Sequence, residues 1–573
     1  MRTILIYSID CMSSEKSLSS APQPSLNPEV SGNLQRIGRF ATRLVLLAFA
    51  FVLLLPILAV LTSVLQWNAE STQILREMSS TVLPDYAITS FVLCVLVAVG
   101  VAIVGVTSAA AVTLFDFAGR KTFEWALLLP LAMPAYVVAY AYTDFLQFSG
   151  LLQTTIRAVF GLEGRVFPEI RSVWGAAWVF TFCLYPYVYL LARTALADRV
   201  THLMDAARLL GAPLRRRIKE VALPLARPAV AAGVALALME TMADFGVSSY
   251  FGIQTFTAGI YKAWLVLDNR IAAAQLSCVL LVVVVLLLRL ERKGQKRMRF
   301  AQTKASGAVS GAAVPLKGKA LLLAWVVCAT PVLMGFVLPL LFIIRPFLAA
   351  LRDERVTLPW AQFGQWAGNS VFLGAVSASL AVALALVIAF VLRVRSDKLS
   401  RTVGTLVGLG YAIPGAVIVV GLLLPVGWLQ AAAPQLDVGY WVTATVLGVI
   451  WAYTVRFTGV ALQSVQSGYA KIPSSFDDSA RMLGVSGLRL LRRVHAPLLK
   501  RSTAAAALLV FVDVMKELPA TLVLRPFNSD TLAVVAYQLA RDERLGEAAL
   551  PALALVLVGL LPVMLLSRTL RQK

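Results

Sequence analysis

The sequence predicts an all-α polytopic membrane protein with about twelve transmembrane helices, arranged as two pseudosymmetric halves of six. The chain has 573 residues, of which 59% are hydrophobic and 14% are charged, whereas a soluble domain is about 45–50% apolar and about 25% charged. Many apolar runs reach the roughly 20 residues that a helix needs to cross a bilayer, and they are too long and too apolar for barrel strands. A polar motif also occurs twice, once in each half of the chain.

Twelve apolar runs are expected to cross the membrane, at about 41–65, 88–114, 124–147, 173–195, 229–250, 272–290, 320–345, 369–392, 402–428, 441–462, 503–522 and 548–567. The loops between them alternate between two faces. One set of loops, together with both termini, holds about two thirds of all Lys and Arg, so the positive-inside rule makes that face cytoplasmic. The net charge of +22 therefore reflects topology, and nucleic acid is not an expected partner.

Composition divides the chain into four parts. Residues 1–37 are mostly polar and are expected to form a disordered cytoplasmic tail. The first transmembrane half covers 38–290 and the second covers 320–573. Residues 291–319 between them are basic and then rich in Gly, Ala and Ser, which predicts a flexible cytoplasmic linker.

The two halves resemble each other outside the motif as well. Ser90 and Ser370 open the second span of each half, and Pro134 and Pro414 interrupt the third, and both pairs have the same separation in the sequence. The two motif copies are slightly closer together than these pairs, which indicates an insertion in the first half, in the outside loop near 148–172. Duplicated membrane transporters usually place the pathway between their repeats.

The repeated motif lies between the fourth and fifth span of each half. The first copy consists of Asp205, Ala206, Ala207, Gly211, Leu223 and Pro224, and the second of Asp478, Ala480, Gly484 and Pro497. An acid is favourable at a helix N-terminus, glycine can adopt the positive φ of a sharp turn, and a proline ends a helix. Each copy is therefore expected to form a short, basic helix pair on the cytoplasmic face.

This pattern resembles the coupling loop of binding-protein-dependent ABC importers, which reads Glu-Ala-Ala, three residues, Gly, nine residues, Ile, any residue, Leu-Pro. The first copy departs from it at Asp205 and Val221, and the second at Asp478, Ser479, Val494 and Ala496. The resemblance implies a loop that docks in a groove of a separate ATPase. It further implies two ATP-binding subunits that hold the ATP, a periplasmic substrate-binding protein, and a multi-pass position in the bacterial inner membrane with both termini cytoplasmic.

Catalytic motifs are missing from the sequence. It holds no GxxxxGK[ST] phosphate loop, so the chain is expected to be a transport subunit without its own ATPase site and without a bound cofactor. The five cysteines form no CxxC pair and predict neither a disulfide framework nor a zinc site. The two histidines, His202 and His495, lie in the repeated loops and are expected on a solvated face.

Four carboxylates fall within the expected membrane spans, where ionisable residues are costly and usually functional. Glu240 and Asp244 lie in the fifth span, and Asp513 and Glu517 lie at the matching positions of the eleventh, with the same separation as the two motif copies. Each pair is spaced i,i+4 and is expected to share a helix face. Pseudosymmetry then predicts a ring of four carboxylates around a translocation pathway, with Lys516 able to neutralise one of them.

The third span adds Tyr136, Tyr140, Tyr142 and Asp144. Carboxylate and phenol oxygens suit hard cations such as ferric iron, so Tyr136 and Tyr140 join the predicted pathway. The alternative is that these polar groups only form hydrogen bonds to neighbouring helices or face water near the ends of the spans.

The cargo follows from a second resemblance. Two fused halves, the stretch 133–141, the stretch 251–256 and the stretch 516–521 are similar to the ferric-iron permease family over roughly residues 40–570. Fused thiamine permeases share the architecture, and phosphonate and polyamine permeases are built from related halves. A secondary transporter would also show duplicated halves and intramembrane carboxylates, but it would not need the paired loops.

Overall fold

The computed structural model describes residues 28–63, 65, 69–197, 201–302, 314–353, 358–395 and 397–571. The chain forms two compact units, residues 1–48 and residues 49–573. In the first unit, the described residues 28–48 belong to helix α1 (Pro28–Ser63). Of the predicted tail, residues 1–27 lie outside the described residues, whereas 28–37 are helical.

The first half continues with a series of helices and single helical turns. They are α2 (Ala69–Ser80), α3 (Leu83–Leu114), α4 (Arg120–Ala126), η1 (Leu129–Ala132), α5 (Ala135–Leu146), α6 (Leu151–Phe160), α7 (Val173–Ala195), α8 (Thr201–Leu209), α9 (Leu214–Arg217), η3 (Ile218–Ala222), α10 (Leu223–Ala243), α11 (Gly246–Phe251), α12 (Phe256–Tyr261), η4 (Lys262–Val266) and α13 (Arg270–Gln302).

The second half follows the same plan. Its elements are α14 (Lys319–Val332), η5 (Leu333–Val337), α15 (Leu338–Arg352), α16 (Trp360–Val394), α17 (Lys398–Val407), η6 (Gly410–Ala412), α18 (Gly415–Ala432), η7 (Pro434–Leu436), α19 (Val438–Thr443), α20 (Leu447–Tyr469), α21 (Ser475–Met482), α22 (Gly487–Leu490), η8 (Leu491–His495), α23 (Ala496–Lys516), α24 (Pro519–Leu524), α25 (Leu532–Arg541) and α26 (Leu545–Arg571). Strands β1 (Phe115–Asp116) and β2 (Val314–Pro315) pair in parallel.

The longest helices in these lists are candidates for crossing a membrane. By length and composition, nine helices within the described ranges could cross a membrane, or ten if a bent pair counts as one span. Each of the twelve predicted spans corresponds to a helix or broken helix, but α20 and α23 are too polar to meet the same criterion. Helix α20 carries Arg456, and helix α23 carries Asp513 and Lys516. These two helices are the reason that twelve spans are predicted but at most ten meet the criterion of length and composition.

The third span of each half is broken at its proline, as the sequence predicts. Pro134 is the N-cap of α5 and Pro414 is the N-cap of α18, and a 3-10 turn and one extended residue precede each of them. In the first half the two arms of the span, Arg120–Ala132 and Ala135–Phe160, meet at 90°. Proline causes the break because it lacks the N–H that would continue the helix.

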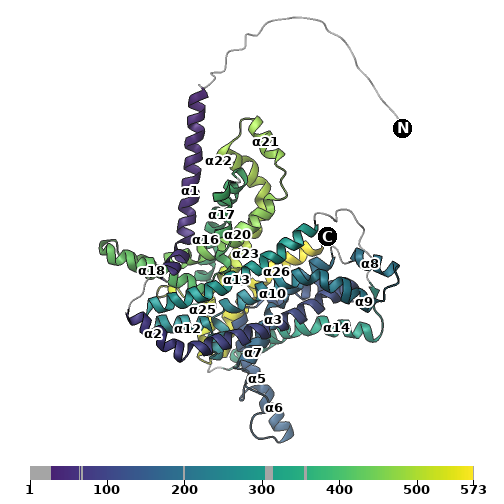
Figure 1. Ribbon diagram of the computed structural model, residues 1–573. Coiled ribbons are helices and arrows are strands. Elements are labelled where there is room, and N and C mark those ends of the chain that lie inside the picture. The colour runs from purple at the N-terminus through teal and green to yellow at the C-terminus, as the bar shows by residue number, and fades with distance from the viewer. Residues whose placement is uncertain are drawn as a thin grey trace. The chain divides into compact units, whose positions relative to one another are not determined.

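Both halves pack their helices in the same way (Figure 1). Helix α3 packs against α7 and α10, and helix α16 packs in the same manner against α20 and α23. The serines that open these spans have matching roles: Ser90 Oγ accepts a hydrogen bond from Phe256 N at 3.1 Å, and Ser370 Oγ accepts one from Leu532 N at 2.9 Å. The internal duplication is therefore present in three dimensions.

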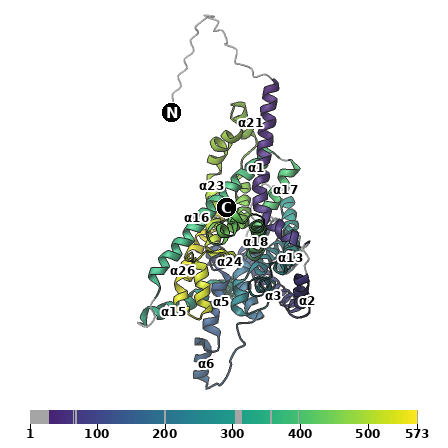
Figure 2. The same cartoon turned by 90° about the vertical axis from the view of Figure 1, so that its left-hand side faces the viewer.

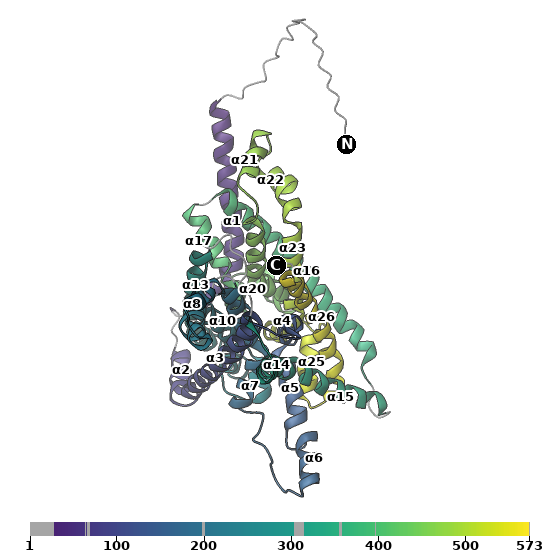
Figure 3. The same ribbon diagram turned by 90° about the vertical axis from the view of Figure 1, so that its right-hand side faces the viewer.

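The first span of each half packs against the other half. Trp451 Nε1 in the second half donates to the Val52 carbonyl of α1 at 3.1 Å. On the other side, α15, in the first span of the second half, packs against α5 of the first half and against α26. Figures 2 and 3 both show α15 beside α5 and α26. Tyr142 Oη donates to the Met334 carbonyl at 2.6 Å in the same contact region. The two halves are thus interlocked.

The predicted insertion and the second copy of the motif lie on opposite sides of the second unit, residues 49–573. Helix α6 belongs to the predicted outside loop near 148–172, and helices α21 and α22 carry the second motif copy. Figures 1, 2 and 3 show α6 and α21 on opposite sides of the packed helices of this unit. This arrangement fits loops on two different faces of a membrane.

Candidate functional site

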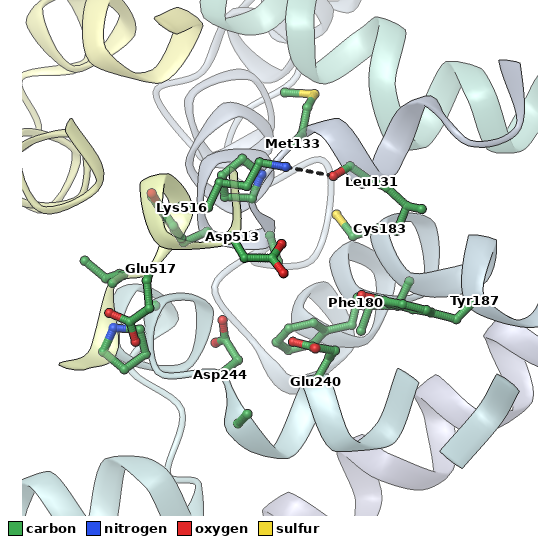
Figure 4. A pocket seen from close by; sticks show the side chains of 18 of the residues that line it. Leu131, Met133, Phe180, Cys183, Tyr187, Glu240, Asp244, Asp513, Lys516 and Glu517 are labelled. Atoms are coloured by element: carbon green, nitrogen blue, oxygen red, sulfur yellow. Dashed lines mark hydrogen bonds between the residues drawn. The ribbon is translucent and has the colours of Figure 1, made fainter. Parts of the chain in front are cut away.

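A polar cavity of about 210 Å³ lies between the two halves. Its wall combines the broken third span with helices α7, α10, α20 and α23 (Figure 4). The ionisable and phenolic side chains in the lining are Tyr136, Cys183, Tyr187, Glu240, Asp244, Tyr411, Arg456, Asp513, Lys516 and Glu517. Backbone breaks at membrane depth are tolerated where they border such a cavity.

The cavity gathers the residues that the sequence assigns to a pathway. All four carboxylates and Tyr136 are in its lining. Tyr140, the sixth predicted residue, is buried and is not in this lining. The internal duplication therefore brings together side chains that are far apart in the sequence, although their part in transport stays a prediction.

Asp244 and Glu517 end their helices and do not extend them. Helix α10 ends at Ala243 and helix α23 ends at Lys516, so each i,i+4 pair spans the end of a helix and not one continuous face. Asp244 Oδ2 accepts hydrogen bonds from the amides of Val247 at 2.8 Å and Ser248 at 3.3 Å. The two carboxylates thus cap the short helices that follow them, α11 and α24.

Glu517 is held by more partners than its counterpart. Its two carboxylate oxygens accept hydrogen bonds from the amides of Ala520 and Thr521, each at 3.0 Å, and one of them accepts a further hydrogen bond from the Thr521 hydroxyl at 2.7 Å. Arg456 Nη1 donates to Glu517 Oε1 at 3.0 Å, and the side chains of this ion pair are 11% and 2% exposed. The alternative that these polar groups bond neighbouring helices therefore describes Glu517 well.

Arg456 is a cavity residue that the sequence reasoning missed. It is an arginine in the middle of the predicted tenth span, so the rule that selected the carboxylates would have selected it too. The structure places it in the cavity lining against Glu517. It brings a fixed positive charge into the cavity that the predicted ring of four acids lacked.

The other charged side chains of the cavity form fewer hydrogen bonds and no ion pairs with described residues. The side chains of Glu240 and Asp513 make no hydrogen bond or ion pair with another residue in the described ranges. Lys516 Nζ donates to the Leu131 carbonyl at 2.9 Å and forms no ion pair with a described carboxylate, so its predicted neutralising role is not a direct contact. Among the described residues, no group of three or more His, Cys, Asp or Glu side chains could hold a metal ion.

The remaining polar residues of the third span have different surroundings. Asp144 forms an ion pair with Arg345 of α15 at 2.5 Å, which ties α5 to the other half. The hydroxyls of Tyr136 and Tyr140 are both buried without a hydrogen-bond partner in the described structure. Tyr136 is the one of the two that lines the cavity.

The two motif copies fold alike. Gly211 and Gly484 have φ of 80° and 76°, which favours glycine. The amides after them close the same turn: Ala212 N donates to the Ala207 carbonyl and Val485 N to the Ala480 carbonyl, both at 2.9 Å. Each glycine therefore ends one short helix and redirects the chain into the next.

Two expectations for the motif were wrong. Pro224 and Pro497 do not stop a helix, because a π-helical turn, η3 or η8, runs directly into α10 or α23, and each proline is the second residue after that turn. Asp205 lies within α8, which begins at Thr201, and not at its N-terminus, and its side chain lies outside the described residues. Asp478 does lie in the first turn of α21.

The turns present matching apolar tips. Leu209 and Leu210 in the first copy are 89% and 87% exposed, and Met482 and Leu483 in the second are 89% and 82% exposed. Exposed apolar side chains at equivalent loop tips are typical of a surface that a partner covers. Both tips are set by the positive-φ glycine that follows them.

A buried polar network supports only the second copy. His495 is fully buried, so its predicted solvated position was wrong. Its Nε2 lies 2.9 Å from Asp477 Oδ1 and its Nδ1 lies 3.1 Å from the Tyr469 hydroxyl. Arg393 Nε of α16 donates to Asp477 Oδ2 at 2.9 Å. The side chain of His202, the other histidine, lies outside the described residues.

The charges around Asp477 set its protonation. Burial alone would raise the pKa of the Asp477 carboxyl, but the hydrogen bonds from Arg393 and His495 outweigh burial and lower that pKa below its usual value. In the first half, Met204 and Ala222 stand at the positions of Asp477 and His495. The network therefore has no counterpart there.

Comparison with known proteins gives one family and several distant relatives. The model of the family described as "Binding-protein-dependent transport system inner membrane component" matches residues 102–300 and 381–573. The "Fe(3+)-transport system permease protein FbpB 2" of Haemophilus influenzae is 25% identical over 484 residues, which cover 84% of this chain and 88% of that protein.

Two further relatives differ in how much of the chain they cover. The "Probable ABC transporter permease protein y4fN" of Sinorhizobium fredii is 24% identical over 82% of this chain and 84% of its own length. The "Putative molybdenum transport system permease protein YvgM" of Bacillus subtilis is 25% identical over 36% of this chain and 90% of its own length.

Proposed function

The chain belongs to the family of binding-protein-dependent transport system inner membrane components, and on that premise we propose that its cargo is ferric iron. The family membership makes it the membrane permease subunit of an ABC importer, without an ATPase domain of its own. It works in a complex with an ATPase and a substrate-binding protein. The identity of the cargo is the part of the proposal that goes beyond the family membership.

The composition of the cavity is the observation that carries the proposal. Four carboxylates and three tyrosines line a space of about 210 Å³ between the halves. Hard oxygen donors are the groups that hard, highly charged cations prefer. The two cations in the lining already have partners within the protein: Arg456 forms an ion pair with Glu517, and Lys516 donates a hydrogen bond to a backbone carbonyl. An anion would meet two carboxylates, Glu240 and Asp513, that have no ion-pair partner among the described residues.

The relatives support the same cargo in part. The similar protein that is named for Fe(3+) transport covers 84% of this chain and includes both halves. The relative named for molybdenum transport covers only about a third. A fused chain with this cavity therefore favours iron over an oxyanion.

Further parts of the proposal concern the complex. Two equivalent loops with exposed apolar tips favour two ATP-binding subunits, one for each loop, with ATP bound by those subunits alone. Both termini and both loops would then lie in the cytoplasm, and the binding protein would deliver its cargo from the periplasmic face.

The experiment is ATP hydrolysis by the purified complex in lipid nanodiscs, measured with the binding protein that co-purifies. Binding protein loaded with ferric iron should stimulate hydrolysis well above the level with the iron-free protein. Metal analysis of the binding protein as purified should find iron. Stimulation by molybdate-loaded or phosphonate-loaded protein, and not by the iron-loaded one, would contradict the cargo and leave the family assignment intact.

A further inference from the structure

The two halves contribute different charges to the cavity at equivalent positions. The separation that relates α10 to α23 also pairs Trp178 with Trp451 in α7 and α20. By the same relation, Arg456 corresponds to Cys183 and Lys516 corresponds to Ala243. All four of these residues line the cavity. Both cations of the cavity therefore come from the second half, and an uncharged residue replaces each of them in the first.

The carboxylates are distributed evenly, in contrast. Glu240 corresponds to Asp513 and Asp244 corresponds to Glu517. The first-half wall consequently carries two carboxylates and no cation, whereas the second-half wall carries two carboxylates and two cations. We call these surfaces the first-half wall (Tyr136, Cys183, Glu240, Ala243, Asp244) and the second-half wall (Arg456, Asp513, Lys516, Glu517).

The second-half wall carries one cation for each of its two carboxylates. Arg456 neutralises Glu517 directly. Lys516 follows Asp513 by three positions in the last turn of α23 and forms no ion pair with it, because its Nζ donates to the Leu131 carbonyl, so its charge offsets that of Asp513 without a direct contact. A cation in the cavity would gain little from this wall.

The carboxylates of the first-half wall have spare oxygens. Asp244 uses Oδ2 to cap α11, and its Oδ1 has no hydrogen bond to another described residue. The Glu240 side chain has no hydrogen bond or ion pair in the same ranges. Figure 4 shows the carboxylates of Glu240 and Asp244 turned toward the same space as that of Asp513, whereas Glu517 lies to one side.

Tyr136 adds an independent sign of a missing ligand. Its side chain lines the cavity and is 5% exposed, yet its hydroxyl has no hydrogen-bond partner among the described residues. A buried polar group without a partner is costly. The equivalent residue of the second half, by the separation of the span-breaking prolines, is Ala416, so this hydroxyl too belongs to the first half alone.

We infer that the cation in transit is held by the first-half wall, through the oxygens of Glu240, Asp244 and Tyr136, while the second-half wall serves as a neutral support. This inference rests on the proposed import of a cation. The donors do not form a closed metal site, which fits a transit site, because an ion must also leave it. Cys183 and Ala243 keep this wall free of positive charge.

The first test is uptake of ferric iron into proteoliposomes by the assembled complex, normalised to folded protein. Glu240→Gln and Asp244→Asn should each lower uptake by about tenfold or more, because one charge at close range is worth over tenfold at an intermediate dielectric. The asparagine oxygen can still cap α11. Asp513→Asn should lower uptake far less. Ala243→Lys, which copies the second half, should lower uptake much further than Ala243→Met, an uncharged variant of similar size.

The second test does not depend on the cargo. Terbium(III), a hard trivalent probe, is titrated into the detergent-purified complex and its tyrosine-sensitised luminescence is recorded. A saturable signal should be present in the wild type and in Asp513→Asn, and should be lost in the Glu240→Gln, Asp244→Asn double variant. Loss of signal and uptake in Asp513→Asn alone, or no change in any variant, would overturn the inference. Terbium binding to the first-half wall without iron uptake by the wild type would overturn the iron cargo and not the site.

Discussion

Arg456 donates to Glu517 at 3.0 Å from the cavity position that Cys183 occupies in the first half. The ion pair links α20 to the break between α23 and α24, where Glu517 also caps the following helix. The corresponding acid of the first half, Asp244, caps α11 without an ion pair to any described residue. The helix break after α23 is therefore held by an ion pair, whereas the equivalent break after α10 is not.

Removal of Arg456 should be costly for folding. Arg456→Leu leaves the carboxylate of Glu517 buried and uncompensated, and breaking a buried ion pair from one side costs about 3–5 kcal/mol. We expect a clear fall in the thermal unfolding temperature of the detergent-solubilised protein. The double variant Arg456→Leu, Glu517→Gln should recover most of it, since no buried charge is then left unpaired. Equal stability of the single variant and the wild type would contradict this role.

The glycines of the two motif copies should be needed for coupling. A β-branched residue at Gly211 or Gly484 must adopt a positive φ, which costs roughly 1–2 kcal/mol or more for a residue with a Cβ. No atom lies within 4 Å of the added Cβ at either position, so the strain is confined to the backbone. We expect Gly211→Val, Gly484→Val to lose uptake while the protein still reaches the membrane.

Gly364 offers a matched control for these variants. It also has no atom within 4 Å of an added Cβ, but it lies inside helix α16 and does not have a positive φ. Gly364→Val should therefore leave ATP-driven uptake close to the wild-type rate. Normal uptake by the Gly211→Val, Gly484→Val protein would reject the coupling assignment.

The apolar loop tips should bind the ATPase. Leu209→Ser and Leu210→Ser, made together with Met482→Ser and Leu483→Ser, remove the exposed apolar surface without a change in the core. We expect co-purification of the ATPase with this variant to fall sharply. Leu162→Ser, an exposed leucine beyond α6, should have no effect. A full yield of complex from the quadruple variant would show that docking does not use these tips.

The network around His495 should hold the second loop and should resist mild acid. The pKa of Asp477 is lowered in the folded protein, so its contribution to stability is complete above the usual aspartate value near 3.9 and is lost as the pH falls through the lower folded value. Hydrogen exchange in residues 475–495 should accordingly stay slow from neutral pH to about pH 5.

His495→Ala, which copies Ala222 of the first half, should speed that exchange at neutral pH, because Asp477 and Tyr469 each lose a buried partner at a cost of about 1–3 kcal/mol. Exchange in residues 205–217 of the first loop serves as the internal reference and should not change. Unaltered exchange in the second loop would mean that the network does not hold it.

Much of this arrangement could be predicted because its signals are local or repeated. The breaks at Pro134 and Pro414 and the turns at Gly211 and Gly484 follow from the backbone preferences of proline and glycine. The gathering of four carboxylates in one cavity follows from the duplication, since equivalent residues of two interlocked halves meet near their common axis. Arg456 has a comparable sequence signal, since it is an arginine within a predicted span.

Other features depend on tertiary contacts that no local pattern records. His495 lies in a basic segment typical of an exposed loop, and only the approach of Arg393 from α16 and Tyr469 from α20 buries it. The sequence predicts a helix stop at Pro224, whereas in the structure the π-helical turn η3 before it continues into α10. The end of α10 at Ala243 is also absent from the sequence pattern, because no proline lies near it to signal a helix break.

ATP-driven uptake of radiolabelled ferric iron is the most direct test of the central claim. The complete complex is reconstituted in proteoliposomes with ATP inside and the iron-loaded binding protein outside, and parallel vesicles receive molybdate or 2-aminoethylphosphonate on their own binding protein. The account predicts that iron accumulates, that accumulation requires both ATP and the ATPase subunits, and that neither anion accumulates. Uptake of an anion in place of iron, or iron uptake by the permease alone without ATP, would contradict it.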